Sequence, residues 1–316
     1  MPAMLTVLAR RLGGMITVMF LVATMVFFLT RLAPGDPAAL MLGDQATPAD
    51  VEQSRRTYGL DRPLPVQYGL WLKEVATGNL GQSIFLQRPV LTAIGERAEP
   101  TFFLALFSIL IASLIGIPAG IVSAVWRGGR SDQVVSAGAM LAASIPSFWL
   151  GLLFIQFFSV RLGWFPVAGY GDPGASLAER LYHLVLPATV LGIVNSALIT
   201  RFTRASMLDV LGEDYVRTAR AKGLPEARVV LRHALGNALV PIITVVGLTA
   251  ALLVGGAIIT ETVFGLPGIG NLVVSAVLRR DYPVIQGALI VVAGIYVIIN
   301  FAIDVIYTLV DPRVKT

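Results

Sequence analysis

One acidic residue, Asp304, lies inside a long apolar stretch near the end of the chain. A carboxyl group at membrane depth is costly and often marks a proton or ion pathway. Asp304 also lies only seven residues before Asp311-Pro312, so its carboxyl group can reach the membrane surface or bond a neighbouring helix. We therefore favour a structural role for Asp304 and keep proton carrying as the alternative.

Other reactive residue types do not occur in catalytic patterns. The lysines Lys73, Lys222 and Lys315 do not follow glycine, so the phosphate-binding pattern G-x-x-x-x-G-K-[ST] is missing. His183 and His233 lie fifty residues apart without an H-E-x-x-H zinc-protease motif. No serine lies in G-x-S-x-G, and there is no cysteine for a disulfide or a thiolate metal site. Nothing in the sequence supports an enzyme.

The composition is that of a polytopic membrane protein. Of 316 residues, 56% are hydrophobic and 14% charged, and the mean hydropathy is +0.78. A spanning helix needs about 20 mostly apolar residues. Six stretches qualify, and the fourth has the least certain ends because it is the shortest and carries Pro187 and Asn195: 12–30, 101–125, 134–160, 184–200, 239–260 and 284–310. We therefore expect an all-α fold with about six transmembrane helices.

The distribution of basic residues predicts the orientation. With both termini in the cytoplasm, the inner pieces hold 13 Lys and Arg in 62 residues, and the outer pieces hold 11 in 116. Basic residues collect in cytoplasmic loops, so this also explains the net charge of +5 without nucleic acid. The expected organisation is a first transmembrane helix at 1–30, an extracytoplasmic cap segment at 31–96 and a transmembrane core at 97–311.

The cap segment and a later outer loop carry local folding signals. Thr47-Pro48, followed by acidic residues, predicts a helix start, and Gly59 predicts its stop. The aromatic residues Tyr68 and Trp71 favour a small folded cap at the membrane surface over a simple tether. The outer loop at 261–283 is apolar but broken by Pro267, Gly268 and Gly270, so we expect it to pack on the bundle without spanning the membrane.

Small residues within the second apolar stretch predict close helix packing. Ala112, Gly116 and Gly120 recur at four-residue spacing, which places them on one face and allows two helices to approach closely in lipid. Prolines inside or near the spans favour a bundle that bends around a pathway; they are Pro118, Pro146 and Pro187.

The loop at 201–238 is basic and contains two short helical segments. In the first, Tyr215, Thr218, Ala219 and Lys222 fall on one side. Gly223 suits the left-handed position after a helix, and Pro225 suits the first turn of the next. The second segment has an apolar stripe, with Arg228 and Arg232 off it: Ala227, Val230, Leu231, Ala234, Leu235 and Ala238. The sequence therefore predicts a helix, a sharp turn and a helix.

Three interpretations of this loop compete. A solvated basic loop explains the charge but not the defined turn. A helix on the lipid surface would need large aromatic residues on its apolar face, which carries Ala, Val and Leu instead. A docking element for a cytoplasmic protein explains both the turn and an apolar face that packs on other helices, so we favour it.

Several motifs, in order along the chain, resemble the permease subunits of binding-protein-dependent ABC importers, and most closely the B-type subunits of the dipeptide, oligopeptide and nickel branch. The loop reads YVRTARAKGL at 215–224 and RHALGNALVP at 232–241. Similar branch motifs are GNLGQS at 78–83, SIPSFWLG at 144–151 and ETVFGLPGIGNL at 261–272. Against the general loop pattern of the importers, Ala219, Gly223 and Leu235 match, whereas Arg217 replaces an acidic residue.

The resemblance implies a type I ABC importer fold in the bacterial inner membrane. It also implies that this chain binds no cofactor itself, because ATP and Mg²⁺ are held by two separate ATP-binding subunits. The expected partners are those two subunits, a homologous second permease subunit, an extracytoplasmic solute-binding protein and the lipid bilayer. The residues expected to dock the ATP-binding subunit are Arg217, Thr218, Ala219, Arg220, Ala221, Lys222, Gly223, Leu224, Pro225 and Glu226.

The substrate is open at this point, and so are the residues of the substrate pathway. Peptides are the commonest cargo of the branch, and glutathione or a nickel chelate are the alternatives. Two other functions are kept as alternatives. A proton-coupled secondary transporter would use Asp304, and a membrane scaffold would recruit proteins without moving any solute.

Overall fold

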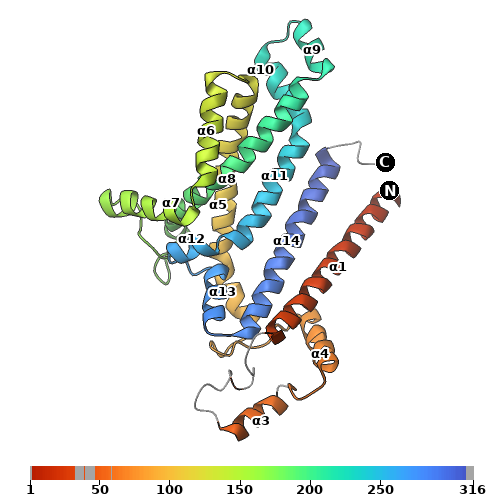
Figure 1. Ribbon diagram of the computed structural model, residues 1–316, viewed down its shortest axis with the longest axis vertical. Helices are drawn as coiled ribbons and strands as arrows, with labels where there is room; N and C mark the ends of the chain where they lie inside the picture. Colours follow the sequence, from red (N-terminus) through yellow and green to blue (C-terminus); the bar gives the residue numbers. More distant parts are fainter. Residues whose placement is uncertain (1, 33–38, 40–46, 58, 311–316) are drawn as a thin grey trace.

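The chain folds into a bundle of long helices, seen in a computed structural model that describes residues 2–32, 39, 47–57 and 59–310 (Figure 1). The expected inner piece 311–316 and part of the cap segment lie outside the described residues. Apart from one isolated bridge between Gln82 and Pro89, the described residues are not in strands. The long helices are α1 Pro2–Leu32, α5 Val90–Val125, α6 Arg130–Ser144, α8 Leu177–Leu211, α11 Leu235–Gly256 and α14 Tyr282–Val310.

Shorter helices connect these elements. They are α3 Pro48–Thr57, α4 Leu64–Ala76, α7 Ser147–Phe154, α9 Asp214–Ala221, α10 Glu226–Arg228, α12 Ile258–Val263 and α13 Ile269–Leu278, with π-helices η1 Ile155–Arg161 and η2 Val229–Ala234. In Figure 1 the start of α1 and the end of α14 lie toward the same end of the molecule as α9, whereas α3 and α4 lie at the opposite end.

Among the described residues, five helices are long and apolar enough to cross a membrane, and there are six crossings if one bent pair of helices is counted as a single span. The third expected span, 134–160, is not one straight helix. The helices Arg130–Ser144 and Ser147–Arg161 meet at 96°. Proline disfavours helical geometry in the residue before it, and Ile145 is accordingly extended ahead of Pro146. The fourth span, expected to be the shortest, belongs to the 35-residue α8, because its polar ends continue the helix beyond the apolar stretch.

The centre of the bundle is the pair α5 and α8. Ala112 is fully buried, and Gly116 and Gly120 lie directly against α8. A Cβ atom on Gly116 would lie 2.8 Å from the Cβ atom of Ile199, and one on Gly120 would lie 2.7 Å from the carbonyl oxygen of Thr200. Both distances are shorter than real Cβ contacts, so the two backbones approach this closely only because these positions lack a side chain.

The described part of the cap segment contains the helices α3 and α4, and α4 packs against the bundle. Thr47 and Asp50 begin α3 with a reciprocal capping box, in which Thr47 N donates to Asp50 Oδ2 at 3.0 Å and Asp50 N donates to Thr47 Oγ1 at 3.3 Å. Tyr68 and Trp71 of α4 pack on Phe27 of α1, with ring centroids 5.3 Å apart in each pair. The two aromatic residues therefore attach α4 to the first helix.

A buried carboxyl group organises the outer loop between α11 and α14. Glu261 is fully buried and accepts hydrogen bonds from Thr101 Oγ1 at 2.6 Å and from Asn271 N at 2.9 Å. A Cβ atom on Gly268 or Gly270 would clash with the Glu261 side chain. The glycines expected only to break this loop therefore also make room for an acid that caps α13, a 10-residue helix that is too short to span.

Candidate docking loop and outer pocket

The loop between α8 and α11 is a compact unit of two short helices. The α9 helix ends at Ala221, and Gly223 follows with φ +74°, a left-handed conformation that glycine adopts without a steric penalty. Gly223 N donates to Arg220 O at 2.9 Å, and Pro225 then precedes α10 with φ −63°. The turn thus reverses the chain in a fixed geometry at the upper end of the molecule in Figure 1.

An apolar cluster holds the two halves of the loop together. Val216 and Ala219 of α9 are buried against Val229, and Leu224 packs beside them. The buried face of α9 is therefore Val216 and Ala219, spaced three residues apart. The sequence placed four residues on one side of this helix. Ala219 is buried, whereas the other three are exposed: Tyr215, Thr218 and Lys222.

The apolar stripe expected in the second helical segment of the loop, at 227–238, is only partly correct. Val230, Ala234 and Ala238 are buried, but Ala227 is exposed and Leu231 is 60% exposed. Val229, outside the stripe, is fully buried instead. The reason is that residues 229–234 form a π-helix, whose wider turn shifts which side chains face inward. A simple 3.6-residue period does not anticipate that shift.

Two ion pairs lie on the exposed side of the loop. Arg220 binds Glu226 across the Gly223 turn, with Nη2 to Oε1 at 2.7 Å and Nε to Oε2 at 3.1 Å. Hydrogen bonds from Arg220 hold the pKa of the Glu226 carboxyl below its ordinary value, and the same contact raises the pKa of Arg220. The second pair joins Arg217 Nη1 to Asp214 Oδ1 at 3.1 Å within α9.

The ten residues expected to dock a partner therefore fall into three groups. Ala219 is buried, and Leu224 is half-buried in the cluster beneath the turn. Gly223 and Pro225 set the turn, and Arg220 and Glu226 close it. The exposed side chains without a place in that framework are Arg217, Thr218, Ala221 and Lys222.

An ion pair between a buried carboxylate and a half-buried guanidinium lies below the loop and was not anticipated. Asp132, near the start of α6, receives Arg204 Nε and Nη2 of α8 at 2.8 Å each. Ser123 of α5 and the backbone N–H of Gly128 also donate to this carboxylate. Asp132 joins three helices two turns before α8 runs into the loop. In sequence, Arg204 and Asp132 look like two ordinary charges at a membrane boundary, so no local pattern indicates their pairing.

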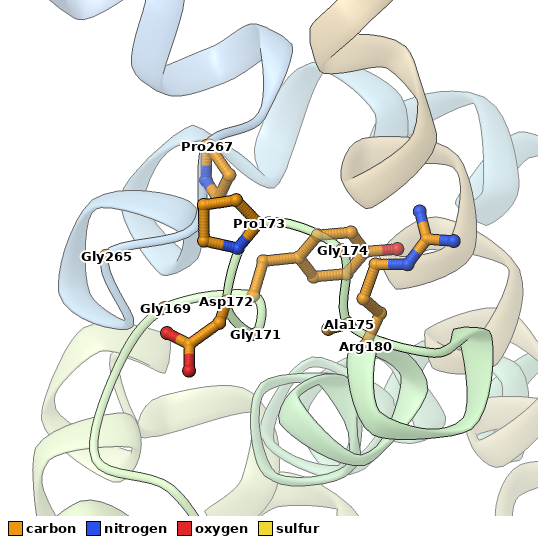
Figure 2. A pocket seen from close by; sticks show the side chains of 10 residues that line it. Gly169, Gly171, Asp172, Pro173, Gly174, Ala175, Arg180, Gly265 and Pro267 are labelled. Carbon is orange, nitrogen blue, oxygen red and sulfur yellow. The ribbon is translucent and has the colours of Figure 1, made fainter.

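A pocket of about 550 Å³ lies between the loop at 169–175 and the turn at Gly265 and Pro267 that follows α12 (Figure 2). Arg180 forms part of its wall and binds Glu99 of α5 at 2.6 and 2.7 Å. Tyr170 OH donates to the same carboxylate at 3.1 Å, and burial together with Glu99 raises the pKa of Tyr170 to about 12. The pocket therefore has a rigid wall whose charges neutralise each other.

The residues considered for proton and metal chemistry lie in separate places. Asp304 of α14 pairs with Arg11 of α1. His183 Nδ1 lies 3.1 Å from the carbonyl oxygen of Gly169, whereas His233 lies in η2 of the candidate docking loop. Within the described ranges there is no cluster of three or more His, Cys, Asp or Glu side chains with metal-binding geometry.

The chain belongs to the family of binding-protein-dependent transport system inner membrane components. The profile of that family matches residues 116–316, and the profile of the N-terminal part of such components matches residues 4–102. The protein is therefore a permease subunit of an importer, a multi-pass protein of the bacterial inner membrane.

Similar proteins match along nearly the whole chain. A probable peptide ABC transporter permease of Sinorhizobium fredii is 44% identical over 97% of this chain and 98% of its own length. A glutathione transport system permease of Pectobacterium atrosepticum is 43% identical over 99% of both chains. Among solved structures, an inward-facing methionine ABC transporter has a TM-score of 0.59, covering 69% of this chain and 96% of its own, at 21% identity. That likeness concerns the fold alone.

Proposed function

We propose that this permease subunit forms half of the translocation pathway of an ATP-driven importer. A homologous second permease would supply the other half, two ATP-binding subunits would bind ATP and Mg²⁺, and an extracytoplasmic protein would deliver the solute. The single observation that carries the proposal is the folded α9–turn–α10 unit at one end of a bundle whose family is that of importer permeases.

The docking residues form the tip of that unit. We infer that the tip binds an ATP-binding subunit through the exposed side of α9 and the turn, from Arg217 to Glu226. Closure of the two ATP-binding subunits would then move the tip. The movement would pass into α8 and α11, which continue directly from the two ends of the loop, and through Asp132 into α5 and α6.

The proposed orientation places the loop and both termini in the cytoplasm. The higher density of basic residues in these pieces supports it. The α3 and α4 helices and the 550 Å³ pocket would then face the extracytoplasmic side, where a solute-binding protein docks.

Peptides are the proposed substrate, most simply di- or oligopeptides. The support is the similarity to a probable peptide permease along nearly the whole chain. Glutathione is the alternative supported by a relative of nearly equal identity, and a nickel chelate is a further alternative from the resemblance.

Purification of the intact complex tests the proposal. The chain would be tagged and extracted from its own cells, and its partners and the ligand of the solute-binding protein would be identified by mass spectrometry. We expect a second permease, ATP-binding subunits and a bound peptide, and ATP hydrolysis in liposomes that rises when the loaded binding protein is added. A chain that purifies without an ATP-binding subunit would contradict the proposal.

A further inference from the structure

The exposed charges of α9 differ in how firmly they are already engaged. Arg220 makes three contacts with the Glu226 carboxylate, at 2.7, 3.1 and 3.3 Å, in a paired arrangement that fixes both side chains. The Nε and Nη2 groups of this guanidinium are therefore already engaged within the loop. Since the pair bridges the two sides of the Gly223 turn, it acts as a brace for the turn.

Arg217 is held much more weakly. Its one ion-pair contact, to Asp214, is made at 3.1 Å within the same helix, and the two side chains are 74% and 94% exposed. Exposed ion pairs at this spacing contribute little to stability, so a carboxylate of a partner protein can replace Asp214 readily.

Lys222 lies just after α9, beside the turn. Its side chain is exposed, and within the described part of the chain no carboxylate pairs with its ammonium group. Lys222 therefore offers its ammonium group to a partner at the tip of the loop.

We propose that α9 presents Arg217 and Lys222 to a carboxylate-lined groove on the ATP-binding subunit, while Arg220 and Glu226 brace the turn that aims them. This inference rests on the proposed function, because it assumes that the loop docks that subunit. It adds the chemistry of the partner surface, which is acidic, and separates two residues that contact the partner from two that position them.

A lipid surface is the other acceptor that basic side chains fit, and the geometry disfavours it. An interfacial helix buries an apolar face among the lipids. The apolar residues of α9, Val216 and Ala219, are already buried against Val229 inside the loop. The loop also extends farther than the α5–α6 turn at this end of the molecule in Figure 1, away from the membrane-crossing part of the bundle.

The test measures binding of the purified cognate ATP-binding subunits to the permease pair in nanodiscs of zwitterionic lipid. Arg217→Glu and Lys222→Glu should each weaken binding about tenfold or more, since charge reversal at a docking contact leaves like charges facing each other. Both variants should also reduce the dependence of binding on salt. Arg127→Glu is the matched control, because it makes the same charge change on the exposed α5–α6 turn at this end of the molecule.

Charge exchange separates the brace from the contacts. Glu226→Arg alone places two arginines across the turn and should weaken binding. Arg220→Glu combined with Glu226→Arg should restore binding to within about fivefold, because the exchanged pair closes the turn with the same two opposite charges. A direct contact between Arg220 and the partner would leave the double variant as defective as the single ones.

Each outcome bears on a different claim. If the unaltered permease pair fails to bind the ATP-binding subunits, the proposed function is wrong. If it binds them and Arg217→Glu and Lys222→Glu bind equally well, the acidic groove is wrong. If those variants lose affinity only in nanodiscs that contain one third anionic lipid, the basic side chains bind lipid, and the proposal is also wrong.

Discussion

The Asp132 carboxylate accepts two hydrogen bonds from the Arg204 guanidinium at 2.8 Å each and joins α6 to α8 directly below the docking loop. The Asp132 side chain is 8% exposed and that of Arg204 32%. Because Ser123 and Gly128 donate to the same carboxylate, the start of α6, the end of α5 and α8 form one connected unit. In the proposed mechanism, this unit moves when the loop is moved.

Breaking this pair should impair both stability and transport. In Asp132→Asn, the Arg204 guanidinium keeps its charge but loses its counter-charge in a mostly buried site, which is strongly destabilising. We expect a lower midpoint of thermal unfolding for the purified complex and uptake reduced at least several-fold. The control is Arg127→Gln, which removes an exposed charge from the neighbouring turn. Unchanged uptake and midpoint in Asp132→Asn would show that the unit has no role.

Gly223→Val should uncouple the loop while the subunit still inserts into the membrane. A Cβ atom at Gly223 would meet nothing within 4 Å, so the effect comes only from φ +74°, where a non-glycine residue costs about 1–2 kcal/mol and a β-branched one more. We expect normal amounts of subunit in membranes and loss of ATP-driven uptake. Gly236→Val, in the helix that follows and also with open space, is the matched control. Normal uptake by Gly223→Val would contradict the role of the turn.

Gly120→Ala should destabilise the contact between α5 and α8. The added methyl group would lie 2.7 Å from the carbonyl oxygen of Thr200, and a helix backbone does not yield easily. Overpacking of this kind costs about 1–3 kcal/mol. Gly138→Ala in α6 meets nothing within 4 Å and should be neutral or stabilise by up to about 1 kcal/mol. The midpoints of thermal unfolding of the two variants would be measured in detergent. Equal midpoints would contradict the close packing of α5 against α8 at Gly120.

Glu261 should make stability depend on pH. Burial raises its pKa above the ordinary 4.5, although Thr101 and two backbone N–H groups oppose the shift. An acid whose folded-state pKa is raised stabilises fully below its unfolded pKa, and this contribution is lost as pH rises through the folded value. From about pH 4.5 upward, Glu261→Gln should therefore gain stability relative to the unaltered protein. Melting curves between pH 4 and 8 test this, with exposed Glu179→Gln as control; parallel curves for Glu261→Gln would contradict it.

The features that sequence predicts here are local ones. Thr47 and Asp50 meet within one helical turn. Gly223 and Pro225 predict a turn because glycine tolerates a positive φ and proline restricts its own φ. Five of the six apolar stretches coincide with described helices that are long and apolar enough to cross a bilayer, because length and hydropathy can be read directly from the sequence.

The features that sequence does not predict depend on distant partners. Glu261 reads as a polar residue at a loop start, and only the fold brings Thr101 to it from 160 residues away. Asp132 and Arg204 are separated by 72 residues. The bend at Pro146 changes the direction of the helix, and the π-helix at 229–234 changes which side chains face inward. Both depend on backbone geometry, so the spacing of apolar residues in the sequence does not predict them.

The most direct test of the account is solute uptake by proteoliposomes that contain the complete complex and its binding protein. Because Asp304 is paired with Arg11, it is not expected to carry protons. We predict uptake with ATP and no proton gradient, no uptake with a gradient and no ATP, and most of the ATP-driven uptake retained in Asp304→Asn. Uptake driven by a proton gradient without ATP, and lost in Asp304→Asn, would contradict the account.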